Sequence, residues 1–151
     1  MKYLHTMIRT SNLVKTIDFY CDKLGLIETK RYDNSKGRFS LVFICAPDDF
    51  KFGIVTNKPL IEITYNWPSE DGKIEVLKTG RNFGHIAFAV NDIYKTCEKL
   101  MKNNIVINRP PRDGHMAFIK SPENISIELL QKGEPKEVMK PWSEMQNIGE
   151  W

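Results

Sequence analysis

The sequence predicts an α+β fold built from two paired βαβββ modules, because an internal repeat relates its two halves. When the chain is shifted by 80 residues, segment 5–16 falls on segment 85–96 with His, Lys and Thr coinciding. Two further matches follow in the same order, 41–44 on 116–119 at an offset of 75 and 60–63 on 126–129 at an offset of 66. Because the offset falls along the chain, we expect a longer loop in the first half, at about residues 47–59.

Each half is expected to contain a strand, a helix and a group of strands. The first helix begins at Ser11 or Asn12 as N-cap and ends before Gly25, with apolar residues at helical spacing between them. The second helix runs from Asn91 to Asn104. Strands are predicted where β-branched residues lie between turn residues, at about 2–9, 27–33, 38–46, 60–66, 84–90, 105–108, 115–120 and 125–131.

The repeat also predicts the domain organisation. We expect one domain and a tail, with boundaries at 1–131 for the domain, about 1–70 and 80–131 for its modules, and 132–151 for the tail. The tail is polar but contains Trp142 and Trp151. These residues predict that it packs on other side chains, for example those of a partner subunit.

Composition excludes several classes of protein. The 151 residues, 41% of them hydrophobic, suffice for one good core. A net charge of +3 without a run of like charges argues against nucleic acid as the partner, while a small anionic ligand stays possible. The longest apolar run, Leu41–Ala46, is too short to span a membrane, and no apolar signal region precedes the first strand. Three cysteines without C-x-x-C spacing argue against a disulfide framework, so we expect a cytoplasmic protein.

The repeat places two His and two Glu residues at equivalent positions. His5 and His85 open the first strand of each half. Glu62 and Glu128 each lie within an apolar strand, and period-two alternation turns each away from its apolar neighbours. A carboxylate inside a sheet is costly unless it is paired or bound to a metal. Two imidazoles and two carboxylates would supply four ligands to one divalent ion, in a set without thiolate that suits an octahedral metal.

A second group of polar residues could bind an anionic ligand. Arg9 follows His5 by four residues and Asn66 follows Glu62 by four, so each shares a strand face with its predecessor. Arg81 lies just before the second His, and Arg109 lies in a proline-rich loop. Arginine binds carboxylates through charge-assisted hydrogen bonds, which makes these residues candidates for substrate binding. The alternative for each arginine is a solvated surface position. His115, which has no counterpart in the first half, is left out of the metal site.

Several segments over residues 4–131 carry a more specific pattern: His5–Arg9, Thr16–Tyr20, Lys23–Leu26, Gly37–Leu41, Ile61–Trp67, Phe83–Ala87, Asp92–Tyr94 and Ser126–Leu129. Together they resemble the glyoxalase I (lactoylglutathione lyase) family of the vicinal oxygen chelate superfamily. The resemblance implies curved mixed sheets that enclose a metal site and a homodimer with shared active sites. It implies metal ligands at His5, Glu62, His85 and Glu128. It also implies glutathione as cosubstrate, contacting Arg9 and Asn66, and more loosely Arg81 and Arg109.

The reaction that the resemblance implies is the isomerisation of the glutathione–methylglyoxal hemithioacetal to S-lactoylglutathione, which detoxifies methylglyoxal. Proton removal from the carbon bearing sulfur gives an enediolate, with Glu128 as the expected base and Glu62 as a ligand and second base. Nickel or cobalt is the expected metal, as in the short bacterial members, with zinc as the alternative. An arginine before the second His and a longer tail depart from many bacterial members and could alter the thiol cosubstrate.

Other functions remain open at this point. Another metal-dependent member of the superfamily could be an epimerase, a thiol transferase or a ring-cleaving dioxygenase. Dioxygenases would be expected to use two His and one carboxylate, so four ligands favour glyoxalase chemistry. A non-catalytic protein could use the same cavity to bind a ligand.

Overall fold

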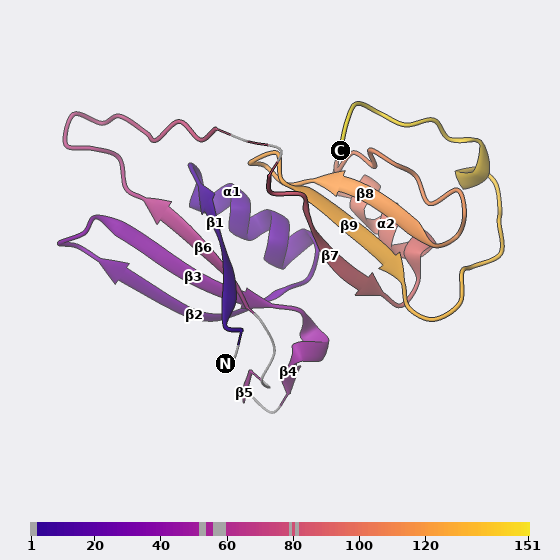
Figure 1. Ribbon diagram of the computed structural model, residues 1–151, viewed down its shortest axis with the longest axis horizontal. Helices are drawn as coiled ribbons and strands as arrows, with labels where there is room; N and C mark the ends of the chain where they lie inside the picture. Colours follow the sequence, from indigo (N-terminus) through magenta and orange to yellow (C-terminus); the bar gives the residue numbers. More distant parts are fainter. Residues whose placement is uncertain (1–2, 52–53, 56–59, 79, 81) are drawn as a thin grey trace. The chain divides into compact units, whose positions relative to one another are not determined.

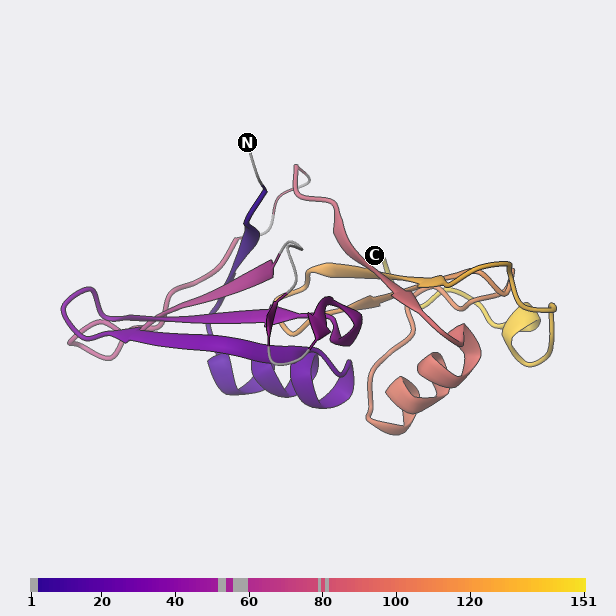
Figure 2. The same ribbon diagram turned by 90° about the horizontal axis from the view of Figure 1, so that it is seen from below.

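The computed structural model describes residues 3–51, 54–55, 60–78, 80 and 82–151. The chain divides into two compact units, Met1–Thr79 and Gly80–Trp151. Each unit contains a mixed sheet and a helix (Figure 1), which confirms the predicted α+β class. Figure 2 shows α1 along one face of the first sheet and α2 along one face of the second. The predicted grouping of residues 1–131 into one domain remains a prediction.

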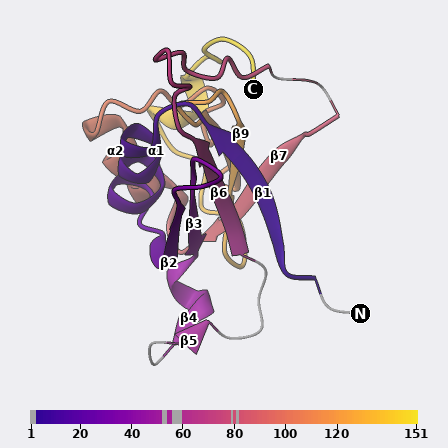
Figure 3. The same ribbon diagram turned by 90° about the vertical axis from the view of Figure 1, so that its left-hand side faces the viewer.

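The sheet of the first unit has four strands in the order β1-β6-β3-β2. Their bounds are β1 His5–Thr10, β2 Ile27–Asn34, β3 Phe39–Cys45 and β6 Leu60–Asn66. Strand β1 pairs with β6 in parallel, as Figure 3 shows from the side, while β6 with β3 and β3 with β2 are antiparallel. Between β3 and β6 lie a short 3-10 helix and a small hairpin, Pro47–Asp49, β4 Phe50–Lys51 and β5 Ile54–Val55. The part of the predicted long loop at 52–53 and 56–59 lies outside the described residues.

The first helix begins as predicted and then changes its geometry. Asn12 is the N-cap of α1 (Leu13–Ile17), since its side chain accepts a hydrogen bond from the backbone N–H of Lys15. The chain continues as a π-helix over Asp18–Lys23, where the sequence predicted regular α-helix. This wider turn accompanies the burial of two consecutive aromatic rings, Phe19 and Tyr20, which contact each other edge to face. Gly25 then ends the helical segment with a φ of +89°.

The second unit repeats this plan with fewer strands. Its elements are β7 His85–Val90, α2 Ile93–Lys102, β8 Met116–Lys120 and β9 Ser126–Gln131, and its sheet order is β7-β9-β8. Strand β7 is parallel to β9, and β8 is antiparallel to it. The cap of α2 repeats that of α1, because the side chain of Asp92 accepts from the backbone N–H of Lys95. The repeat therefore extends to the local hydrogen bonds that start each helix.

The prediction of a strand at 105–108 is wrong. This segment is irregular, and the residue after it, Arg109, forms an isolated bridge with Phe118. Two physical reasons limit the pairing. Pro110 and Pro111 have no backbone N–H with which to continue a ladder, and the backbone of Asn108 is already bonded to Ile148 of the tail.

The tail packs on its own unit. Trp142 begins a short 3-10 helix, Trp142–Glu144, and is 3% exposed, with its ring stacked on Tyr94 at a centroid distance of 5.8 Å. The backbone N–H of Lys136 donates to the carbonyl of Gly114. Trp142 is thus buried within the chain itself, while the predicted packing of the tail on a partner remains a prediction.

The cores alternate along the strands as period-two patterning requires. In the first unit Val42, Ile44 and Ile63 are fully buried, and in the second Ile127 and Leu129 are. All three cysteines are free thiols, and two of them, Cys45 and Cys97, are buried. In the described part of the chain, no helix has the length and apolar character needed to cross a bilayer.

Candidate active site

In the first unit, His5 and Glu62 come together across the parallel pair β1–β6. His5 lies opposite Leu60 in the ladder, and Glu62 follows two residues later on the same face. The Nε2 atom of His5 is 3.2 Å from Oε2 of Glu62. The other carboxylate oxygen accepts a hydrogen bond from the Thr64 hydroxyl at 3.2 Å. The Glu62 side chain is only 13% exposed, so its carboxylate is largely removed from water.

The second unit reproduces this geometry. His85 lies opposite Ser126 in the β7–β9 ladder, and Glu128 again follows two residues later. The Nε2 atom of His85 is 3.1 Å from Oε2 of Glu128, whose side chain is 14% exposed. The repeat seen in the sequence is therefore a repeat of side-chain geometry as well.

The histidine of each His–Glu pair contacts a phenylalanine that was not among the site residues predicted from the sequence. Phe43 lies opposite Glu62 in the sheet, and Phe118 lies opposite Glu128. The His5 ring meets Phe43 edge to face at a centroid distance of 5.9 Å, and His85 meets Phe118 in the same way at 5.6 Å. The offset-75 match in the sequence already aligned these two phenylalanines. Their rings cover one side of each imidazole and restrict its orientation.

The donor atoms of each pair fit a metal ion. A neutral imidazole nitrogen and a carboxylate oxygen that face each other at 3.1–3.2 Å need a proton or a cation between them. Two ligand atoms at adjacent positions of a divalent ion, each about 2.1 Å from it, lie about 3 Å apart. Among the residues that the structure describes, no group of three or more His, Cys, Asp or Glu side chains is placed to hold a metal. Each unit thus offers half of the predicted four-ligand set.

Two of the predicted anion-binding residues meet in the first unit. The side-chain amide of Asn66 donates to Oε2 of Glu75 at 2.7 Å, and Nε of Arg9 lies 3.9 Å from Oε1 of the same carboxylate. Arg9 and Asn66 therefore both face one carboxylate. Glu75 was not selected from the sequence, where it lies in a polar loop without a repeat partner.

The other two predicted anion-binding residues are Arg81 and Arg109. Arg81 lies outside the described residues. The guanidinium of Arg109 donates to the Asp113 carboxylate at 2.8 Å and to the carbonyl of Met116. Burial raises the pKa of Asp113, but hydrogen bonds from Arg109 and from the backbone N–H groups of His115 and Met116 outweigh it and lower the pKa to about 2. Arg109 is thus engaged within its own loop, and its contact with a substrate remains a prediction.

This fold and this pair of His–Glu sites are those of the Glyoxalase/Bleomycin resistance protein/Dioxygenase superfamily. The sequence profile of that superfamily matches residues 2–129, so the chain belongs to it. The chain is 36% identical over 142 residues to a probable lactoylglutathione lyase from Synechocystis, covering 91% of this chain and 100% of that protein. It is also 36% identical over 137 residues to the lactoylglutathione lyase of Neisseria meningitidis serogroup A, covering 87% and 91% of the two chains.

A solved structure agrees with these sequence relatives. The glyoxalase I of Leishmania major, described as trypanothione-dependent, superposes with a TM-score of 0.73 and 29% identity, covering 87% of this chain and 86% of that one. The resemblance found in the sequence is therefore confirmed at the level of family and fold.

Proposed function

We propose that this chain is a lactoylglutathione lyase, a glyoxalase I that isomerises the glutathione–methylglyoxal hemithioacetal to S-lactoylglutathione and so detoxifies methylglyoxal. The observation that carries this proposal is the repeated His–Glu–Phe arrangement on two equivalent strand pairs. Relatives named lactoylglutathione lyase at 36% identity over almost the whole chain support it.

His5, Glu62, His85 and Glu128 are the proposed metal ligands. When bound, a divalent ion there would stabilise negative charge that develops on the two oxygens of the substrate. The set contains nitrogen and oxygen donors without thiolate, which is compatible with nickel or cobalt, the metals we propose, as well as with zinc. All four residues have their donor atoms paired within 3.2 Å in the two units, so each pair is preorganised by its sheet.

Glu128 is the proposed catalytic base. Its carboxylate takes the proton from the carbon bearing sulfur and returns it to the neighbouring carbon, so the reaction consumes no water and changes no redox state. Glu62, its equivalent in the first unit, is proposed as the base for the opposite diastereomer of the hemithioacetal.

The remaining proposals concern partners and compartment. Arg9, Asn66, Arg81 and Arg109 are proposed to bind the carboxylates of glutathione. We propose a homodimer in which His5 and Glu62 of one subunit join His85 and Glu128 of the other, because a twofold axis would bring complementary halves together twice. The three free thiols suit a reducing compartment, and we propose the cytoplasm.

The test of this function is turnover after metal exchange. The protein is stripped of metal with a chelator, and the hemithioacetal is supplied with nickel, cobalt or zinc while the thioester product is followed by its ultraviolet absorbance. We expect no turnover without metal and the highest turnover with nickel or cobalt. Highest activity with zinc would contradict the metal assignment, and absence of turnover with every metal would contradict the enzyme.

Arg9→Ala is expected to raise KM for the hemithioacetal by about 10- to 100-fold, because a charge-assisted hydrogen bond is lost. The kcat should change much less, since the carboxylate contact exists in both the ground and transition states. Steady-state kinetics measure both constants. Arg31→Ala is the matched control, because Arg31 forms an exposed ion pair with Glu28 away from the site. An unchanged KM in Arg9→Ala would place Arg9 on the solvated surface.

A further inference from the structure

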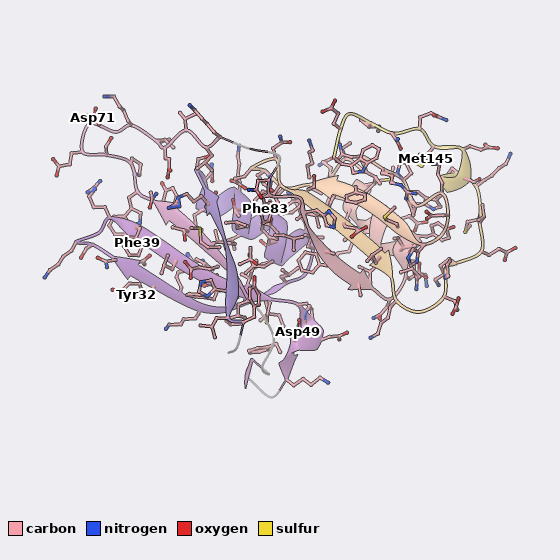
Figure 4. The ribbon with its side chains drawn as sticks, viewed as in Figure 1. Tyr32, Phe39, Asp49, Asp71, Phe83 and Met145 are labelled. Carbon is pink, nitrogen blue, oxygen red and sulfur yellow. The ribbon has the colours of Figure 1, made fainter. Side chains whose placement is uncertain are left out.

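A loop follows β6 and begins beside the predicted anion-binding residues. Over residues 67–78, here called the β6 loop, the chain has no regular secondary structure. Its start is anchored: the backbone N–H of Trp67 donates to the carbonyl of Arg38, and its indole N–H donates to the Ser40 hydroxyl at 2.8 Å. The turn from Ser69 to Lys73 closes on itself through hydrogen bonds between these two residues. Figure 4 shows Asp71 at the far tip of this turn.

The returning arm of the loop brings a carboxylate back to the sheet at Glu75. One oxygen of Glu75 accepts a hydrogen bond from the amide of Asn66, and the other faces Nε of Arg9. This arrangement, one oxygen to an amide and one to a guanidinium, is the way in which such a pair binds the carboxylate of a ligand. A side chain of the protein therefore occupies the position proposed for a substrate carboxylate.

The contact of Glu75 with Arg9 and Asn66 should cost little free energy to break. Ile74 and Val76, the apolar neighbours of Glu75, are 57% and 84% exposed, so the arm buries little apolar surface when it lies on the sheet. The Glu75 and Arg9 side chains are themselves 39% and 43% exposed, and exposed ion pairs stabilise only weakly. Segments with few buried apolar contacts open most easily.

We infer that Glu75 is an internal competitor of the substrate: it occupies the Arg9–Asn66 subsite in the unliganded chain, and a carboxylate-bearing thiol adduct displaces it on binding. The inference rests on the proposed function, because it takes this subsite to be the one that binds a carboxylate of the thiol. It goes beyond that function by making the β6 loop a determinant of affinity. Removing the charge of Glu75 should favour the substrate, whereas removing the charge of Arg9 should disfavour it.

Glu75→Gln tests this with Glu70→Gln as its matched control, since Glu70 is exposed on the same loop. We expect Glu75→Gln to lower KM for the hemithioacetal about 2- to 5-fold, the scale of an exposed ion pair, with kcat unchanged. Glu70→Gln should leave both constants at the wild-type values. In an Arg9→Ala background Glu75→Gln should have a smaller effect on KM, because one of the two groups for which Glu75 and the substrate compete is gone while Asn66 remains.

A second readout does not depend on turnover. S-Methylglutathione, a stable thioether with the carboxylates of the substrate, should bind Glu75→Gln about 2- to 5-fold more tightly than wild type in calorimetry. Its binding to wild type should speed hydrogen exchange at the backbone amides of residues 74–78. These results would support the inference even for a chain that showed no lyase turnover.

Two results would overturn the inference. If wild type turns over the hemithioacetal and Glu75→Gln behaves like Glu70→Gln, the competition does not exist while the proposed function stands. If Glu75→Gln raises KM and weakens S-methylglutathione binding, Glu75 is a contact for the ligand, such as its ammonium group, and not a competitor.

Discussion

Glu128→Gln is expected to lose turnover by about 10²- to 10⁴-fold while it keeps its fold and its bound metal. The amide is nearly isosteric with the carboxylate, so it preserves the packing of a side chain that is 14% exposed. Its oxygen can still bind a metal ion, but the amide cannot accept the proton from the substrate carbon. The measurements are kcat for the hemithioacetal, metal content per chain and the thermal unfolding midpoint.

Glu134→Gln, on the exposed tail, serves as the control for the loss of a carboxylate elsewhere in the second unit. Glu62→Gln is the informative comparison, because it makes the same change at the equivalent position of the first unit. We expect it to lose the share of turnover that passes through the opposite diastereomer. Near-normal activity in Glu128→Gln would show that Glu128 is not the base.

Mixing inactive subunits is expected to restore activity in one combination and not in another. If the site joins the two units of different subunits, a heterodimer of His5→Ala with Glu128→Gln has one doubly damaged site and one intact site. With half of the dimers mixed, activity should return to roughly a quarter of the wild-type value. The measurement is turnover after subunit exchange of the two purified, separately inactive variants.

The control is a mixture of two lesions in the same unit. His5→Ala mixed with Glu62→Gln should restore no activity beyond the residual turnover of Glu62→Gln alone, because each site of the heterodimer then carries one lesion. If both mixtures stay inactive although exchange is verified by mass, all four ligands come from one chain and the shared site is wrong. The metal assignment would survive that result.

Much of the fold could be predicted because the same pattern of strands and helix occurs in both halves of the sequence. The helix starts follow from short-range chemistry: the sequence predicted Ser11 or Asn12 as the first cap and a second helix from Asn91, and the structure has caps at Asn12 and Asp92. The π-helix over Asp18–Lys23 could not be predicted, because it accompanies tertiary burial of two consecutive rings. The segment 105–108 has strand-like residues, but the N–H of Ile105 donates to Leu100 of the preceding helix and the carbonyl of Asn108 accepts from Ile148 of the distant tail. Sequence periodicity carries no information about such long-range competition.

The candidate site was predictable only as far as strand alternation and the repeat reach. They predict that Glu62 and Glu128 lie on the strand faces opposite their apolar neighbours. In the structure each glutamate has its histidine within 3.2 Å. The assembly of the two pairs into one site remains a prediction. Glu75 escaped notice because its contact depends on how an irregular loop returns to the sheet, which no spacing rule describes.

The ladder register of the two His–Glu pairs also bears on how this chain could have diverged from a duplicated half. In both units the glutamate lies two positions beyond the residue that faces the histidine. A single inserted residue within either strand would turn the carboxylate to the opposite face and bury the wrong side chains, so selection would remove it. Insertions are tolerated in the connections, which is where the two halves differ in length. Substrate preference can therefore evolve through loop length, one half at a time, while the paired strands are inherited unchanged.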